Sequence, residues 1–444
     1  MNTLGSKFKL ARKEKGLTQA QLSDESISRS MISLIENNLT KPSLETLKYI
    51  AAKLEKPLSY FLSETQYVSI PYENLIMELE ELLLIESYEE IIKKTEEFIA
   101  LYKELSHASI NKRSLGIFHA ILGICYYYKN EEKAEDYFRA AINNLENMNR
   151  SKYLYLCLNY LGLIKYHQKK YAEMEQLLLT ADSLLNIVTL NNVYLKVDIL
   201  HNLALNYSAQ HKFMESIKVI KRALTYCLKY DFNINFGELN RIASMCYKYM
   251  NQLDEAILCS TNAVNYYLLS NNTTLLHRCY INLCILYRAK RDKDHALYYI
   301  EKAMRYFEQT NNHPKLVNCH IEKTITLFEF DSDSCFIKDL ISITIDLPSI
   351  TDSGRGELLA ILGILELREK NYSKALELLS NADTLVPLEA QSDMSIFIYK
   401  GLHIIYEHNK DDANSIHYKQ KAEALLSVKP YYYNFIKQVA EDPL

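Results

Sequence analysis

A pattern of small and bulky residues recurs about every 40 residues along most of this chain, and it constrains the fold more than any other feature. In each copy, Leu and a small residue, often followed by Tyr, precede a later triplet of small, bulky and small residues. The triplet begins at positions 134, 174, 216, 256, 296 and 375. The last step spans two periods, so we expect a degenerate copy between Asn311 and Leu347, and looser copies cover 73–105 and 393–426. Such periods are typical of stacked helical hairpins, here about nine.

The clearest copy explains why the small residues recur. It consists of Leu122, Gly123, Tyr126, Ala134, Phe138 and Ala141. Where two helices cross, Gly or Ala lets the backbones approach, and Tyr fills the space beside them. The chain has 10 Gly and 8 Pro, with no Pro between Pro71 and Pro314, whereas a barrel or sandwich needs turn residues every few positions. The sequence therefore predicts an all-α fold.

Residues 1–66 lack the repeat, and we interpret them as five short helices. The first helix has Leu4, Phe8 and Leu10-Ala11 at helical spacing. The residues expected to cap, stop or start helices are Gly16, Thr18, Ser28, Asn37-Asn38, Ser43 and Pro57. Ile32 and Ile35 would anchor the third helix in a core, and the inward residues expected on the fourth are Leu44, Leu47, Ile50, Ala51 and Leu54. These helices would form a compact bundle.

Charge divides the chain in the same place. Residues 1–66 carry ten Lys or Arg and seven Asp or Glu, a net charge of +3, whereas the rest of the chain carries −7. A small basic head on an acidic body is a modest indication of a polyanionic partner. We expect no signal peptide, because Met1–Lys7 has no apolar run behind its charges, and no apolar stretch approaches the length needed to span a membrane.

Three motifs in the head carry a specific resemblance. "ARKEKGLTQAQLS", "SRSMISLIENN" and "KPSLETLKYIAAKL" resemble the helix-turn-helix domain of xenobiotic-response-element-type repressors, over residues 4–62. Between Leu22 and Ile32 the chain is one residue shorter than the commonest version and lacks its turn Gly. The resemblance implies that the third helix enters the major groove of DNA.

On this interpretation, the outer face of the third helix reads bases. Arg29 can donate two hydrogen bonds to guanine, Ser30 can pair with either base type, and Leu34 can meet a thymine methyl group. The residues placed to hold phosphates are Gln19, Ser33, Asn37 and Lys41. The alternative is that Arg29 and Ser30 belong to an ordinary solvated surface.

The body resembles the tetratricopeptide repeat, although its period exceeds the usual one of about 34 residues. The resemblance implies a right-handed superhelix whose concave face binds extended peptides. Asn202 and Asn282 occupy the same repeat position two copies apart, and an amide can bind the C=O and N–H of a peptide unit together. The peptide-binding residues predicted on this basis are Asn159, His201, Asn202, Asn240, Arg241, Arg278, Asn282, Arg288 and Asn318. The alternative is that Asn is simply common in this chain.

Together, the head with its shortened turn and the long repeat array resemble the RRNPP quorum-sensing regulators. The domains would be 1–66, a linker at 67–72 and a repeat domain at 73–444. The resemblance implies a cytoplasmic homodimer that binds a palindromic DNA operator and is controlled by a short signalling peptide. One alternative is a bifunctional regulator that also binds or dephosphorylates a response regulator, and another is a DNA-binding scaffold for a protein partner.

The sequence offers little for catalysis. We find no pairing of nucleophile and base, no phosphate-binding loop and no spacing typical of a metal site, so we expect neither an enzyme nor a cofactor. The nine Cys are scattered through helical patterns, and we expect them to be buried and reduced.

Overall fold

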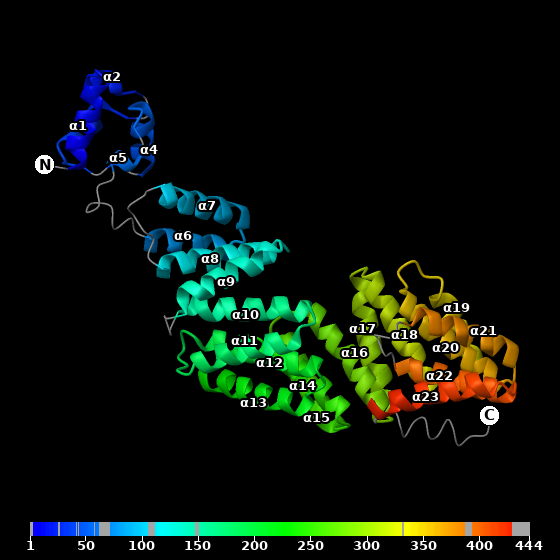
Figure 1. The fold of residues 1–444 in the computed structure, drawn as a ribbon. Coiled ribbons are helices and arrows are strands. Elements are labelled where there is room, and N and C mark those ends of the chain that lie inside the picture. The colour runs from blue at the N-terminus through cyan, green and yellow to red at the C-terminus, as the bar shows by residue number, and fades with distance from the viewer. Residues whose placement is uncertain are drawn as a thin grey trace. The chain divides into compact units, whose positions relative to one another are not determined.

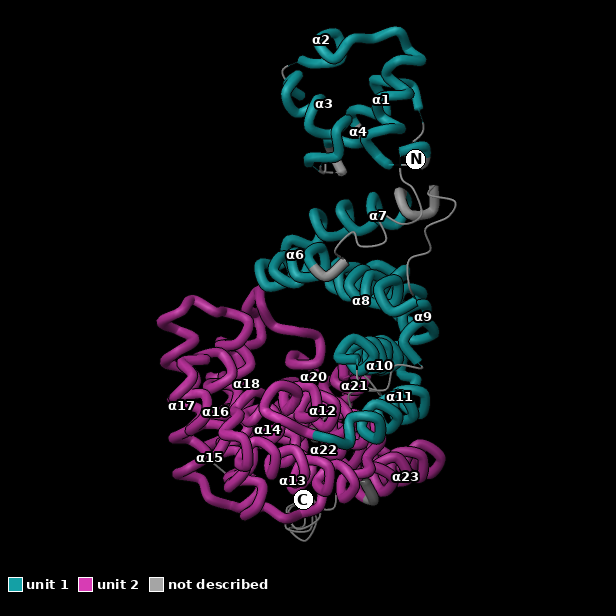
Figure 2. Tube along the Cα trace, turned by 90° about the vertical axis from the view of Figure 1, so that its left-hand side faces the viewer, with its two compact units in different colours: residues 1–187 teal, residues 188–444 magenta. Residues whose placement is uncertain are grey.

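The computed structural model describes residues 3–24, 27–40, 42, 44–56, 58–61, 72–104, 112–146, 151–330, 333–386 and 393–428. Every regular element in these ranges is an α-helix, which confirms the predicted all-α fold (Figure 1). The chain folds as two compact units, residues 1–187 and 188–444 (Figure 2). The boundary between head and array, predicted at 66–73, stays a prediction, because residues 62–71 lie outside the described residues and Tyr72 already begins a helix.

The head consists of short helices around its own apolar core. They are α1 (Leu4–Glu14), α2 (Gln19–Leu22), α3 (Arg29–Glu36), α4 (Leu44–Lys53) and α5 (Leu58–Phe61). The core contains Leu4, Phe8, Ala11, Leu22, Ile27, Ile32, Ile35, Leu47, Ile50, Ala51, Leu54 and Phe61. On α1, Ala11 packs inward and its neighbour Leu10 is exposed. The side chain of Leu44 lies outside the described part.

Local polar contacts explain where the head helices begin and end. Thr18 and Gln21 form a reciprocal capping box at the start of α2, and the Ser28 hydroxyl accepts from the Met31 N–H at the start of α3. Gly16, after α1, has a φ of 74°, and Asn38, after α3, has a φ of 58°. These caps and turns are those expected from the sequence. The expected caps at Ser43 and Pro57 fall outside the described residues.

The rest of unit 1 is a series of helical hairpins. Its helices are α6 (Tyr72–Leu84), α7 (Tyr88–Glu104), α8 (Lys112–Tyr128), α9 (Lys133–Leu145), α10 (Lys152–His167) and α11 (Tyr171–Leu184). Gly123 shows why the repeat needs a small residue. A Cβ at that position would lie 2.7 Å from the ring of Phe138 on α9, so the two helices pack closely only because the side chain is missing.

Unit 2 continues the series. Its helices are α12 (Val193–Ala209), α13 (Phe213–Tyr230), α14 (Phe236–Tyr249), α15 (Leu253–Leu269), α16 (Thr273–Ala289), α17 (Lys293–Gln309), α18 (His313–Glu329), α19 (Ser334–Thr344), α20 (Asp352–Arg368), α21 (Tyr372–Leu385), α22 (Asp393–His408) and α23 (Asp412–Val428). Each even-numbered helix packs against the odd-numbered helix that follows it. The interval between Asn311 and Leu347, where the sequence pattern is degenerate, contains α18 and α19.

The cysteines mostly pack inside this array. All nine are free thiols; seven are buried, Cys259 is half-buried and Cys335 is exposed. Burial raises the pKa of the Cys125 thiol to about 12, so this side chain stays neutral. The expectation of buried thiols was therefore wrong for Cys335. Among the described helices, none is long and apolar enough to cross a membrane.

Candidate DNA-binding face and candidate peptide groove

The three residues predicted to read bases lie on one exposed side of α3. Ile32 and Ile35 are buried on the opposite side and fix this helix to the core. Arg29 and Ser30 occupy its first turn and are exposed, and Leu34 leaves 41% of its surface accessible. Arg29 has no ion pair with any described residue. This face therefore presents a cation, a hydroxyl and an apolar side chain to whatever binds the head.

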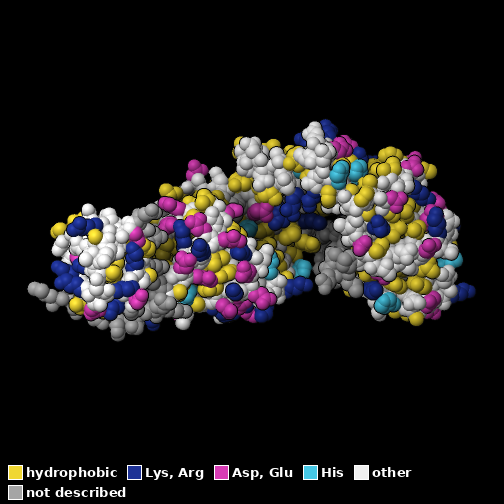
Figure 3. All heavy atoms as spheres, turned by 90° about the horizontal axis from the view of Figure 1, so that it is seen from above, with side chains coloured by type: hydrophobic (Ala, Val, Ile, Leu, Met, Phe, Trp, Pro, Cys, Tyr) yellow, Lys and Arg dark blue, Asp and Glu magenta, His cyan; other side chains and the backbone are white. Residues whose placement is uncertain are grey.

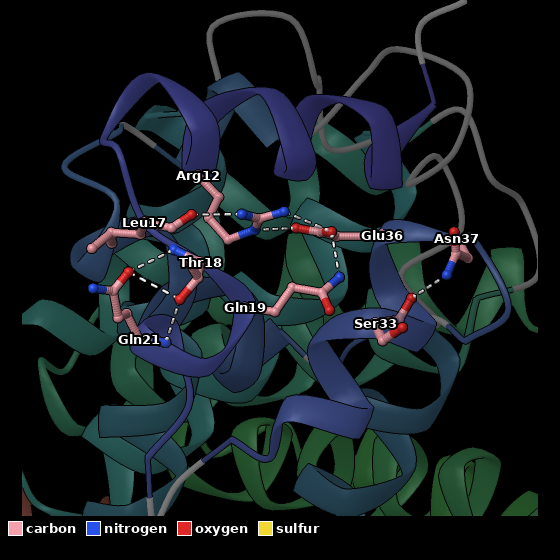
Figure 4. Close-up of polar contacts among 8 residues, drawn as sticks. All are labelled: Arg12, Leu17, Thr18, Gln19, Gln21, Ser33, Glu36 and Asn37. Carbon is pink, nitrogen blue, oxygen red and sulfur yellow. Dashed lines mark hydrogen bonds and ion pairs between the residues drawn. The ribbon is translucent and has the colours of Figure 1, made fainter.

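The head contains a buried ion pair between Arg12 and Glu36 (Figure 4). Arg12 Nε donates to Glu36 Oε1 at 2.5 Å and Arg12 Nη2 to Glu36 Oε2 at 3.1 Å, while Nη1 donates to the Leu17 carbonyl at 2.5 Å. Burial disfavours the charged form of Glu36, but the hydrogen bonds from Arg12 and Gln19 outweigh it and hold the pKa of the Glu36 carboxyl below its usual range. The pair ties α1 to the C-terminal end of α3.

Gln19 belongs to this network. Its Nε2 donates to Glu36 Oε2 at 2.7 Å, so the donor expected to hold a phosphate is already engaged inside the head. Sequence reasoning missed the roles of Arg12 and Glu36. A signal was present, because Glu36 lies four residues after Ile32 and Arg12 four residues after Phe8, which puts both charges on buried helix faces.

The remaining predicted phosphate contacts are only partly described. Asn37 is exposed, and its Nδ2 donates to the Ser33 carbonyl at 2.9 Å, which closes the end of α3. Ser33 is half-buried. Lys41 lies outside the described residues. The DNA-contact assignments stay predictions.

Several residues predicted to bind peptide are held by neighbours within unit 2. Asn202 is 4% exposed, and its Oδ1 lies 3.0 Å from Nδ1 of His201. Burial lowers the pKa of His201, although nearby carboxylates oppose the shift. Asn240 donates to the Phe236 carbonyl at 2.9 Å in its own helix, and Arg241 pairs with Glu238 at 2.8 Å.

Asn282 bridges three helices. Its Nδ2, on α16, donates to Ser260 Oγ on α15 at 2.6 Å and to Ser244 Oγ on α14 at 3.1 Å, and the two hydroxyls lie 3.0 Å apart. Ser244 stands where other copies of the repeat carry Gly, Ala or Cys, and Ser260 stands where they carry a bulky residue. The amide nitrogen of Asn282 thus stabilises the stacking of neighbouring hairpins.

Arg288 is also part of the packing. It is 3% exposed and lies 2.8 Å from Glu322 Oε2 and 3.3 Å from Glu329 Oε1, both on α18. Asn159 lies buried on α10 of unit 1. The structure therefore gives internal positions to most of the predicted peptide ligands.

Two predicted residues do come together at an open cavity. Arg278 on α16 and Asn318 on α18 line a cavity of about 310 Å³ that extends to the start of α20. The full lining is Arg278, Ile281, Lys315, Asn318, Ile321, Glu322, Thr351, Ser353, Gly354 and Glu357. All of these residues lie on the first helices of consecutive hairpins or just before one. On the face drawn in Figure 3, acidic and basic side chains are intermixed, with a local group of Lys and Arg near the middle of the view.

Comparison with known proteins gives one family match, at the N-terminus, and several matches to solved structures. Residues 8–61 match the helix-turn-helix family. No curated protein sequence is similar to the chain. The apo form of RapI shares 13% identity with a TM-score of 0.59, and the match covers 84% of this chain and 99% of RapI.

Two further solved structures score lower. A Rap protein complexed with competence and sporulation factor shares 14% identity, with 84% of this chain and 100% of that chain covered and a TM-score of 0.48. Another is PlcR of Bacillus thuringiensis, solved in complex with the peptide PapR7 and DNA. It shares 19% identity with a TM-score of 0.37, and the match covers 62% of this chain and 99% of PlcR. At these identities the comparisons bear on the fold alone, and the RapI match carries it.

The family matched by the head is one of DNA-binding domains rather than of enzymes. The array behind the head consists of helical hairpins with the fold of RapI. Residues 8–61 therefore match the helix-turn-helix family, and the chain shares its helical-hairpin fold with RapI.

Proposed function

We propose that this chain is a transcription regulator that binds duplex DNA through α3 and is switched by a short signalling peptide held by its helical array. The observation that carries the proposal is the exposed face of Arg29, Ser30 and Leu34 on a helix-turn-helix head. The function would be quorum sensing by a cytoplasmic homodimer on a palindromic operator. It requires no catalytic group and no cofactor.

The DNA contacts follow from the side chains on α3. The Arg29 guanidinium donates two hydrogen bonds to the O6 and N7 of one guanine, and Leu34 packs on a thymine methyl group. Ser33, Asn37 and Lys41 hold phosphates, which fixes the register without reading sequence. Gln19 stays a predicted phosphate contact, and its Nε2 also links α2 to α3 through Glu36.

Peptide and DNA would be coupled by linkage. A peptide that binds one arrangement of the hairpins better than another changes the spacing of two heads, and so changes whether they match two half-sites. The open cavity lined by Arg278 and Asn318 supports peptide binding at this end of the array. Of the seven other predicted ligands, His201 and Asn202 lie on α12 and Asn240 lies on α14.

The test is selection of an operator by the full-length chain from random duplex DNA, followed by base-by-base substitution. Arg29→Ala should cost about 1–3 kcal/mol and relax the preference at one base pair. Arg113→Ala, which removes an exposed arginine from α8, is the matched control and should bind like the wild type. Unchanged affinity and base preference in Arg29→Ala would contradict the placement of α3 on DNA.

A further inference from the structure

The cavity in unit 2 has a distinct chemical character. Its walls come from three consecutive first helices, with Arg278 and Ile281 on α16, Ile321 on α18 and Gly354 on α20. Gly354 packs closely on this wall, because a Cβ there would lie 2.6 Å from Cδ1 of Ile321 and the end of that side chain would have to shift. The cavity is thus a feature of the packing of α20 against α18.

Two cations in the cavity lack an anionic partner. The Arg278 guanidinium and the Lys315 ammonium group form no ion pair and no side-chain hydrogen bond with any described residue. The carboxylates of the lining are already engaged. Glu322 lies 2.8 Å from Arg288, and Glu357 also interacts with another residue. A ligand anion would complete the charge balance around Arg278 and Lys315.

Neighbouring groups favour an anion in the same place. The side chain of Asn318 is exposed and can donate from its amide nitrogen. The N-terminus of α20, a helix of 17 residues, borders the cavity, with Thr351 as its cap. The partial positive charge of that helix end adds to the two cations. Ile281 and Ile321 supply an apolar wall beside these polar groups.

We propose that this cavity binds the C-terminal residue of the signalling peptide, an inference that rests on the function proposed above. Arg278 and Lys315 bind the free carboxylate, Asn318 donates to it, and an aliphatic side chain packs on Ile281 and Ile321. The lining offers cations beside an apolar wall, and a C-terminal residue with an aliphatic side chain carries the matching carboxylate and apolar group together. The peptide would then run from this end of the array toward α14 and α12.

The experiment uses the full-length chain and a positional library of linear hexapeptides, synthesised once with free C-termini and once with C-terminal amides. A shift in melting temperature identifies the peptides that bind, and calorimetry then measures the tightest free-acid peptide and its amide. We expect amidation to weaken binding roughly 10- to 100-fold, because it removes charge-assisted hydrogen bonds. The preferred final residue should be aliphatic.

Variants connect this effect to the cavity. Arg278→Ala and Lys315→Ala should each weaken binding of the free acid, and amidation should cost much less in Arg278→Ala than in the wild type. Arg305→Ala, which removes an exposed arginine from α17 outside the cavity, is the matched control and should behave like the wild type. Melting temperatures without peptide check that the variants fold.

Three results would overturn the inference. Equal affinity for acid and amide excludes the carboxylate contact, and a full amidation penalty in both alanine variants places it elsewhere. A loss of binding when an internal Asp or Glu of the peptide is replaced, without an effect of amidation, assigns the anion to a side chain. If peptides bind without regard to their C-termini, the proposed function stands and this subsite falls. If no peptide binds at all, the proposed function fails with it.

Discussion

The ion pair between Arg12 and Glu36 should control whether the head folds. Both side chains are buried, at 8% and 5% exposure, and Arg12→Ala removes three hydrogen bonds while leaving the Glu36 carboxylate with Gln19 as its remaining partner among those described above. Breaking a buried pair from one side costs about 3–5 kcal/mol. A domain of this size has a total stability of roughly 3–9 kcal/mol. The substitution should therefore unfold the head in a large fraction of molecules.

Amide hydrogen exchange read by mass spectrometry can measure this effect region by region. In Arg12→Ala, protection of α1–α5 should fall by roughly 10²- to 10⁴-fold, whereas that of α12–α17 should stay unchanged. DNA binding should weaken in proportion. Lys56→Ala, which removes an exposed ion pair with Glu14, is the control and should leave exchange almost unaltered.

A second variant separates the charge from the packing. Replacing both partners with apolar residues, Arg12→Met with Glu36→Leu, should recover most of the lost stability, because no buried charge is left unpaired. Wild-type exchange in Arg12→Ala would refute the reasoning, since it would mean that Glu36 finds water or another partner. An unrecovered double variant would assign the loss to packing.

Three further predictions concern the array. Asn282→Ala should lower the free energy of unfolding of unit 2 by about 1–3 kcal/mol, because the amide bridges Ser244 and Ser260. Urea unfolding measures this loss. A change in peptide affinity without any loss of stability would contradict the structural role of Asn282. Arg288→Ala should lower the free energy of unfolding by about 3–5 kcal/mol, because the buried Glu329 loses its ion pair with Arg288. An unchanged melting temperature would argue against the importance of this ion pair. Hydrogen bonds to Glu366, from Lys374 first, lower its pKa to about 2. Because the pKa of Glu366 is lower in the folded chain than in the unfolded one, the ionised carboxylate stabilises the fold above the unfolded pKa. That stabilisation is lost as the pH falls toward 2, so stability should depend less steeply on acid pH in Glu366→Gln.

The sequence by itself determined the local structure. The hydroxyls of Thr18 and Ser28 accept hydrogen bonds from the first turns of the helices that directly follow them. Gly123 marks the crossing of two helices within one hairpin. These features depend on residues a few positions apart or on a repeated spacing, so the pattern of residue types is enough to predict them. The exposed face of Arg29, Ser30 and Leu34 follows in the same way from the inward positions of Ile32 and Ile35.

The tertiary structure decided which polar residues are free. Asn202 and Asn282 share a repeat position, yet Asn202 is buried beside His201 and Asn282 bridges two serines 22 and 38 residues away. The sequence suggests Arg288 as a peptide ligand, and in the fold it forms an internal ion pair with Glu322. The cavity draws its lining from positions 278–281, 315–322 and 351–357, which lie about one repeat apart, but which of their side chains border open space depends on how α16, α18 and α20 pack. Whether a polar side chain meets a ligand or a neighbour depends on which helices pack together, and that is decided by the whole array.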